Sequence, residues 1–282
     1  MFRPKLPAYL AEAFEDLYAE DGLLVLARGL GLIQILTAFA YFYGDYERED
    51  GHVALVASEN QSQDHKKRKV HDGGKKERCV IRPLVFILGL KESECSSLLN
   101  QLRDWGVSDS RFLPTFITSD SGQAQDRAVM YRRGGVFVVT SRILIVDLLN
   151  QVVQASEIEC FLVANAETVT DLSTEAFILR IYKTQHRHHR AICNDGGSYI
   201  GDSCFTVTAA AGAVKAFSSS PTALLDGFAK VDKVLKALQV RKLYLYPRFH
   251  ASVADELERN QPHVDEVHVV SETLKLLLVG AY

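Results

Sequence analysis

Residues 21–31 read DGLLVLARGLG, and this segment determines which class of fold the chain can adopt. Its first two residues, an Asp-Gly pair, interrupt the helical pattern that precedes them. Residues 23–27 form a continuous apolar run of strand length, typical of a strand buried on both faces of a parallel sheet. Gly29 and Gly31 then predict a turn, and the apolar spacing over residues 33–40 predicts a following helix.

The rest of the chain repeats this alternation of strand and helix. Apolar runs predict further strands at residues 82–90, 136–140, 158–164, 214–217 and 242–246, and a weaker one at 52–57. Apolar spacing predicts helices at residues 7–20, 93–105, 121–133 (capped by Ser121), 141–148, 172–182 and 223–239 (with Phe228 on its inner face). Such alternation indicates an α/β fold with a central, mostly parallel sheet and helices on both faces. Sheets of this kind hold ligands at the carboxyl ends of their strands.

Composition excludes several classes of protein. The chain has 282 residues, 47% of them hydrophobic and 24% charged, which is typical of a globular protein and too apolar for a disordered one. Its net charge of -3 excludes a histone-like polycation but not a local basic face. No apolar run reaches the roughly 18 residues of a membrane span, so no membrane association is expected. The five cysteines are scattered and form no C-x-x-C pair, which disfavours disulfides and structural zinc.

Two segments interrupt the alternation. Residues 58–79 are polar and hold seven Lys or Arg residues, which predicts a disordered insertion. Within it, Lys66, Lys67, Arg68 and Lys69 form a candidate nuclear import signal, which would need the same exposure. Residues 190–213 are rich in glycine and alanine, and so long a loop is unusual inside a compact domain. We interpret them as a second disordered insertion or as an artefact of the gene model.

The sequence predicts that the chain does not hydrolyse ATP. A nucleotide-hydrolysing lobe of this architecture carries G-x-x-x-x-G-K-[ST] after its first strand, where amides and the lysine hold phosphates. Here Arg28, Gly29 and Gly31 form a degenerate version of that loop, without the lysine or the hydroxyl. The acidic pair expected after a later strand is also degenerate, because Asn165 and Glu167 leave a single acid.

Other catalytic and metal-binding patterns are absent from the sequence. The histidines of the segment QHRHHR at residues 185–190 have adjacent cations and no nearby cysteine or carboxylate, which favours a solvated basic turn over zinc. The nucleophile motif G-x-S-x-G does not occur. We therefore predict no catalytic residue and no metal site.

Cations that flank predicted strands remain as candidate binding residues. Any one of them is more simply explained as a surface cation, but as a group they suggest contacts with the phosphates of a DNA backbone. The six candidates are Arg28, Arg142, Lys215, Arg241, Lys242 and Arg248. Some of them are expected on the ligand-facing rim of the sheet.

Four stretches resemble the amino-terminal region of the XPF family of structure-specific DNA repair endonucleases. They are residues 21–31, residues 131–149, residues 174–180, and residues 215–218 combined with 240–249. They keep the family's order and extend over nearly the whole chain, apart from the two insertions.

The resemblance implies a RecA-like lobe of the superfamily 2 helicase type that has lost ATP hydrolysis, at residues 1–246. Residues 247–282 would then be the truncated beginning of a helical domain. The segment SSSP at residues 218–221 stands where active helicases have a Thr-Ala-Ser-Pro-like motif. The family acts in the nucleus, in nucleotide excision repair, interstrand crosslink repair and recombination, as a heterodimer with a smaller non-catalytic subunit. Its helicase-like part is thought to engage branched DNA and repair scaffold proteins.

The chain departs from the family at its carboxyl end. The family's nuclease motif E-R-K-x-x-x-D, which holds Mg or Mn, lies far beyond residue 282, and the tandem helix-hairpin-helix domain is missing too. The resemblance thus implies no cofactor in this chain and does not carry over DNA cleavage. Three hypotheses stay open: a DNA-binding module, a residual ATPase, and a truncated fragment or partial gene model without a function of its own. The apolar run at residues 274–279 favours the last.

Overall fold

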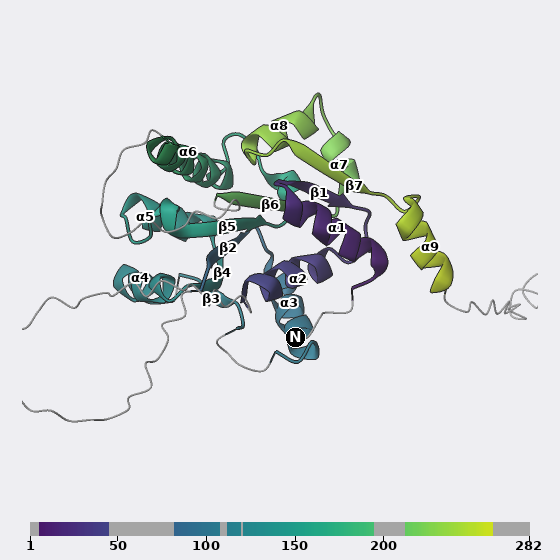
Figure 1. Ribbon diagram of the computed structural model, residues 1–282, viewed down its shortest axis with the longest axis horizontal. Helices are drawn as coiled ribbons and strands as arrows, with labels where there is room; N and C mark the ends of the chain where they lie inside the picture. Colours follow the sequence, from purple (N-terminus) through teal and green to yellow (C-terminus); the bar gives the residue numbers. More distant parts are fainter. Residues whose placement is uncertain (1–5, 45–81, 108–111, 120, 195–211, 262–282) are drawn as a thin grey trace, which may run out of the picture.

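A single sheet forms the centre of the protein. The computed structural model describes residues 6–44, 82–107, 112–119, 121–194 and 212–261. Its strands are β1 (Gly22–Leu26), β2 (Leu84–Leu88), β3 (Thr115–Ile117), β4 (Gly135–Val139), β5 (Ile158–Val163), β6 (Ala213–Ser218) and β7 (Lys242–Tyr246). They lie in the order β3-β4-β2-β5-β6-β1-β7, which Figure 1 shows from bottom to top. Every strand pair in the described part of the chain is parallel, which confirms the expected parallel sheet.

Burial explains why the strands could be recognised. Every residue of β1, β2, β4, β5 and β6 is buried, so these strands have no alternation of polar and apolar side chains. Neighbouring side chains still point to opposite faces. Leu23 and Val25 enter one hydrophobic cluster, whereas Leu24 and Leu26 enter the other.

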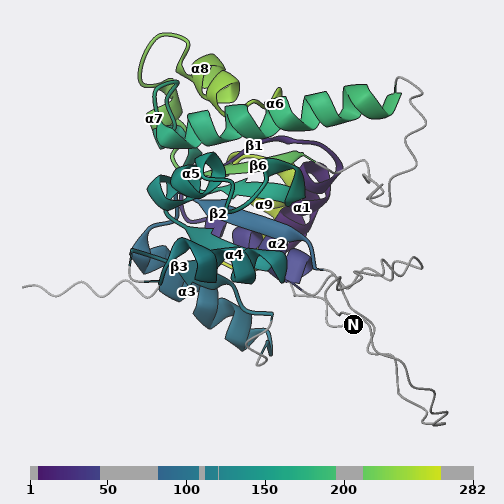
Figure 2. The same ribbon diagram turned by 90° about the vertical axis from the view of Figure 1, so that its left-hand side faces the viewer.

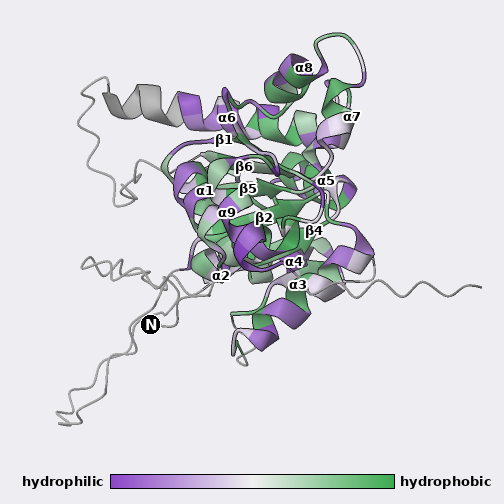
Figure 3. Ribbon diagram, turned by 90° about the vertical axis from the view of Figure 1, so that its right-hand side faces the viewer, coloured by the Kyte–Doolittle hydropathy of each residue, from purple (hydrophilic) through white to green (hydrophobic). Residues whose placement is uncertain are grey.

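Helices cover both faces of the sheet. They are α1 (Ala8–Ala19), α2 (Leu32–Gly44), α3 (Glu92–Asp104), α4 (Ala124–Arg132), α5 (Ser141–Leu149), α6 (Thr174–Asn194), α7 (Pro221–Leu225), α8 (Lys230–Ala237) and α9 (Ala251–Arg259). Residues of α1, α2, α3 and α9 pack into one cluster, and residues of α4 to α8 pack into the other. Figure 1 shows α4, α5 and α6 on one side of the sheet and α1, α2 and α3 on the other. In Figure 3 the apolar strands lie between helices with polar outer faces.

Two helix predictions need correction. Helix α4 begins at Ala124 and its cap is Gln123, because the Ser121 hydroxyl instead accepts a hydrogen bond from the Thr118 N–H at 2.8 Å. The helix predicted at residues 223–239 is two helices, α7 and α8. The Asp-Gly pair at residues 226–227 breaks it, and Phe228 in this connection is 91% exposed instead of facing the core.

The second insertion is shorter than predicted, and one strand was missed. Helix α6 continues to Asn194 and projects beyond the sheet in Figure 2, so residues 190–194 are helical, and β6 begins at Ala213. Strand β3 has one buried side chain among its three residues, and so short an edge strand leaves no periodic signal. The predicted strand at 52–57, the insertion at 58–79 with its import signal, the remaining insertion residues 195–211 and the run at 274–279 lie outside the described residues.

Candidate functional site

Two similar turns follow the neighbouring strands β1 and β7. They consist of residues 27–30 and residues 247–250, and we call them the twin turns. In each turn the N–H of the fourth residue donates to the carbonyl of the first, at 3.1 Å after β1 and at 3.0 Å after β7. Arginine is the second residue of both turns, as Arg28 and Arg248. All strands are parallel, so the twin turns lie at the carboxyl end of the sheet, where ligands bind in folds of this class.

The twin turns contact each other. Strands β1 and β7 pair as far as Leu26 and Tyr246, and the Arg248 Nη2 donates to the Arg28 carbonyl at 2.9 Å. Both arginines are exposed, and neither forms an ion pair with a carboxylate among the described residues. The fold thus brings together two candidate residues that are far apart in the sequence.

The degenerate nucleotide loop is a tight turn. Gly29 and Gly31 have φ angles of 88° and 78°, in the left-handed region that glycine adopts without strain. Leu30 between them is buried, and its carbonyl accepts a hydrogen bond from the Tyr9 hydroxyl at 3.2 Å. A Cβ added at Gly31 would lie 2.5 Å from the Gln34 Oε1, so side chains already fill the space beside this loop.

The degenerate acidic box holds a structural amide. Asn165 follows β5 in the left-handed conformation with φ 49°, and its side chain is buried. Its Nδ2 donates to the Gly89 carbonyl at 3.0 Å and to the Glu94 Oε2 at 2.9 Å, which ties the end of β5 to the end of β2. Glu167 lies in the short 3-10 helix that follows, and its Oε2 is buried without a hydrogen-bond partner among the described residues. One amide therefore stands where an acid would be needed to hold magnesium.

Two further cations lie at the carboxyl end of the sheet. Arg142 is the exposed second residue of α5, directly after β4. Next to it, the Ser141 hydroxyl donates to the Glu175 carboxylate at 2.6 Å and so fixes α5 to α6. Lys91 is exposed and follows β2, but it was not among the predicted binding residues, although the predicted strand at 82–90 ends directly before it. Its position just after a strand was the available signal.

The other three candidate cations lie at the amino end of the sheet. Lys215 and Lys242 are both in register with Gly22, the first residue of β1, and Arg241 directly precedes β7. Lys215 is 3% exposed, and its ammonium lies 3.2 Å from the Asp21 Oδ1, so it cannot reach a large ligand. This corrects the expectation for Lys215, because it lies near the start of its strand and is buried against Asp21 at the end of the sheet opposite the twin turns.

A buried acid on α5 has a structural explanation. Asp147 has no exposed area, and its oxygens accept hydrogen bonds from Arg127 at 2.6 and 2.8 Å and from the Tyr131 hydroxyl at 2.9 Å. Burial raises the pKa of Tyr131, and the hydrogen bond to Asp147 raises it further. Asp147 therefore joins α4 to α5 and is not available as a reactive acid.

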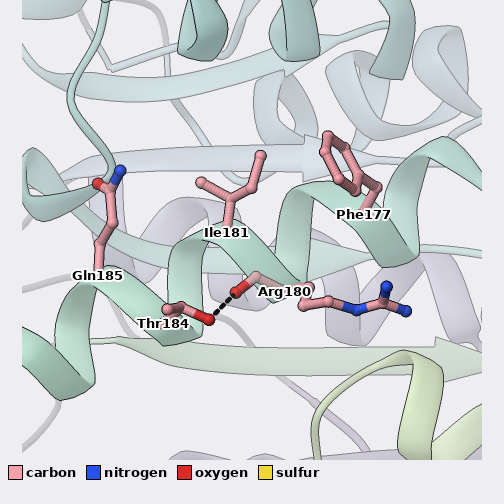
Figure 4. A pocket seen from close by; sticks show the side chains of 5 residues that line it. All are labelled: Phe177, Arg180, Ile181, Thr184 and Gln185. Carbon is pink, nitrogen blue, oxygen red and sulfur yellow. Dashed lines mark hydrogen bonds between the residues drawn. The ribbon is translucent and has the colours of Figure 1, made fainter.

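One further feature of the described surface is a hollow that is open to solvent. Figure 4 shows a shallow hollow on the outer face of α6, lined by Phe177, Arg180, Ile181, Thr184 and Gln185. A single helix lines it, and the Thr184 hydroxyl donates to the Arg180 carbonyl at 2.7 Å.

The described residues contain no group of three His, Cys, Asp or Glu side chains placed to hold a metal. Among the same residues, no helix is long and apolar enough to cross a membrane.

The fold is similar to that of a solved helicase domain. The helicase domain of Hef from Pyrococcus furiosus superimposes with a TM-score of 0.57 and 14% identity, over 89% of this chain and 40% of that one. No protein-family model matches the chain.

Known proteins with similar sequences are DNA repair endonucleases. The Cricetulus griseus DNA repair endonuclease XPF is 30% identical over 254 residues, which is 90% of this chain. The Arabidopsis thaliana DNA repair endonuclease UVH1 is 38% identical over 55% of this chain and 14% of its own length. The DNA repair protein rad16 of Schizosaccharomyces pombe is 26% identical over 93% of this chain and 23% of its own. The chain is therefore a relative of the XPF family of DNA repair endonucleases, and it spans about a fifth (21%) of the length of the first of them.

Proposed function

We propose that this chain is a helicase-like module that binds branched or damaged DNA, at junctions of single and double strands, without hydrolysing ATP. The observation that carries the proposal is the pair of twin turns, which present Arg28 and Arg248 side by side at the carboxyl end of the sheet. Arg142 and Lys91 extend this surface across the sheet. Exposed cations without carboxylate partners attract the phosphates of DNA and release counterions from them.

The loop after β1 supports the absence of ATP hydrolysis. Five residues, 27–31, connect β1 to α2, and they include neither a lysine nor a hydroxyl. The Leu30 N–H is already bonded within its turn, so it is not free to hold a phosphate. Asn165 removes an acid from the place where a magnesium ligand is needed.

The similarity to XPF proteins supports a proposal about the wider role of the module. We propose that it serves nucleotide excision repair, interstrand crosslink repair and recombination in the nucleus, together with repair scaffold proteins. DNA cleavage with Mg or Mn would belong to the nuclease region of the family's longer proteins, and the small non-catalytic subunit would bind mainly to their tandem helix-hairpin-helix domain. Lys66, Lys67, Arg68 and Lys69 remain the candidate import signal.

Fluorescence anisotropy of the full chain with labelled forked DNA tests the proposal. We expect binding at about 50 mM salt that weakens steeply as salt is raised, with a logarithmic slope of about -3 if three to four phosphates are contacted. A phosphate-release assay with ATP and magnesium is expected to stay at background. Absence of binding at low salt would contradict DNA binding, and ATP turnover that depends on Arg28 would support the residual ATPase instead.

The alternative is a truncated fragment without a function of its own, which the chain's share of its relatives' length keeps open. A urea or thermal melt of the 282-residue chain separates the two hypotheses. A cooperative transition is expected for a module with two packed clusters around one sheet. A chain that melts gradually and binds no DNA would favour the fragment.

A further inference from the structure

We propose that Phe249 stacks on a base of single-stranded DNA whose phosphates contact Arg28 and Arg248. This inference rests on the DNA binding proposed above and specifies which form of DNA reaches the carboxyl end of the sheet. It adds an aromatic residue to the basic surface formed by the two arginines.

The second twin turn holds Phe249 out in solvent. Arg248 and Phe249 are its two central residues, and the Phe249 side chain is 87% exposed. Pro247 fixes the backbone at the start of the turn, and the His250 ring packs on the Tyr246 ring with centroids 4.8 Å apart at its end. Both flanks of the turn are therefore anchored, so Phe249 is presented to a ligand without having to be released from the core.

The surroundings of Phe249 indicate a polyanion as its ligand. Arg248 directly precedes Phe249 in the turn. The hydrogen bond from Arg248 to the Arg28 carbonyl shows that Arg28, a second arginine, lies next to this turn. No described carboxylate forms an ion pair with either arginine. An exposed aromatic ring beside cations is the arrangement by which proteins hold single-stranded nucleic acids, with bases on the ring and phosphates on the cations.

Duplex DNA fits this site less well than a single strand. Bases in a duplex are stacked on one another, so the face of the Phe249 ring could meet one only at an end or where the strands separate. The arginines can contact phosphates of either form. The proposal thus predicts that Phe249 contributes to binding of single strands and forks, and that it contributes little to binding of a closed duplex.

Phe228 provides a matched control. It is 91% exposed and lies in the connection between α7 and α8, where Asp226 stands two residues before it. It therefore has the exposure of Phe249 without an adjacent arginine. The only tryptophan of the chain, Trp105, is half-buried and packs edge-on against Tyr41, with centroids 6.4 Å apart, so it gives a constant background signal.

The experiment uses the full chain with Phe249→Trp or Phe228→Trp and follows tryptophan fluorescence during titration with oligo(dT). We expect quenching of Phe249→Trp at saturation and a signal close to wild type for Phe228→Trp. Phe249→Ala is expected to weaken oligo(dT) binding by about tenfold and blunt duplex binding by less than about twofold, whereas Phe228→Ala changes neither. Thermal melts check that the variants stay folded, which is expected because both rings are exposed.

The outcomes separate this inference from the proposed function. If the wild-type chain binds forked DNA but Phe249→Ala keeps its affinity for oligo(dT), the stacking site is wrong and DNA binding stands. Equal quenching in both tryptophan variants would also overturn the site, because it would indicate nonspecific contact. If the wild-type chain binds no DNA at low salt, the proposed function fails together with the site.

Discussion

The two ends of the sheet carry the same kinds of residue and use them differently. At the amino end, Lys183 and Lys215 lie 2.7 and 3.2 Å from the Asp21 carboxylate, and Lys242 pairs with Glu20. At the carboxyl end, Arg28, Arg142 and Arg248 form no ion pair among the described residues. Three lysines at the amino end thus have carboxylate partners, whereas the three arginines at the carboxyl end have none among the described residues.

One acid connects several elements at the amino end. Lys183 of α6 also donates to the Gly212 carbonyl at 2.6 Å, directly before β6, and Lys215 donates to the Tyr18 carbonyl at 3.3 Å. Asp21 therefore links α6, β1 and β6 at a single point. The contrast with the carboxyl end can be tested by removing charges from each end in turn and measuring both stability and DNA binding.

The largest effect is expected from Asp21→Asn, which removes the negative charge from the amino end. Lys215 would stay buried without a counter-charge, so the free energy of unfolding should fall by about 2 to 3 kcal/mol, below the full value of a buried pair because Asp21 is partly exposed. Urea denaturation measures this, with Glu20→Gln as a control that should change stability by less than about 1 kcal/mol. An equal loss of stability in both variants would contradict the prediction, because it would show that the buried partner of Asp21 makes this acid no more important for stability than Glu20.

The next effect is expected from the double variant Arg28→Ala and Arg248→Ala at the carboxyl end. Loss of two phosphate contacts should weaken binding to forked DNA by an order of magnitude or more at low salt, and should reduce the salt slope by about 2. Fluorescence anisotropy over a series of salt concentrations gives both quantities. Stability should barely change, since both side chains are exposed. If the double variant keeps the wild-type salt slope, the twin turns are not part of the DNA interface.

A smaller effect is expected from Arg142→Ala. Arg142 lies beyond β2, β5 and β6 from the twin turns, at roughly 20 Å for strands spaced about 4.8 Å apart, so only a DNA strand that crosses the sheet reaches both. We expect a twofold to fivefold loss of affinity for long single strands and a slope reduced by about 1. Oligonucleotides of different lengths check this, because a short one that fits only the twin turns should not sense the change.

The smallest effect is expected from Lys242→Ala. This lysine is exposed but pairs with Glu20 at the amino end, so forked DNA should bind within about twofold of wild type. Its exposed ion pair should contribute less than about 1 kcal/mol to stability. Anisotropy and urea denaturation of the same preparation measure both. A loss of affinity as large as that of the arginine double variant would place the DNA interface at both ends of the sheet.

Local sequence predicted the centre of the sheet well, because burial on both faces leaves an uninterrupted apolar run. Strands β1, β4 and β5 lie within a residue of their predicted bounds for this reason. The division between α7 and α8 was missed because the apolar spacing continues across the Asp-Gly pair. Strand β3 was missed because it has almost no buried face.

The candidate site was only partly predictable. Arg28 and Arg248 were each predicted to follow a strand. Their contact depends on the pairing of β7 with β1, which the tertiary fold determines and local sequence does not predict. The predicted strand at 214–217 placed Lys215 near its start, but the burial of Lys215 against Asp21 depends on the pairing of β6 with β1. The structural role of Asn165 could not be predicted either, because the carbonyl that it binds follows β2 and the carboxylate that it binds lies in α3, both far from it in the sequence.

The position of β1 has a consequence for how the protein is made. Both neighbours of β1 come from late in the chain, because β1 pairs with β6 on one side and with β7 on the other. A ribosome therefore releases this wholly apolar strand long before either partner exists. Translation that stops ahead of β6 would leave β1 with two open edges, a state prone to aggregation.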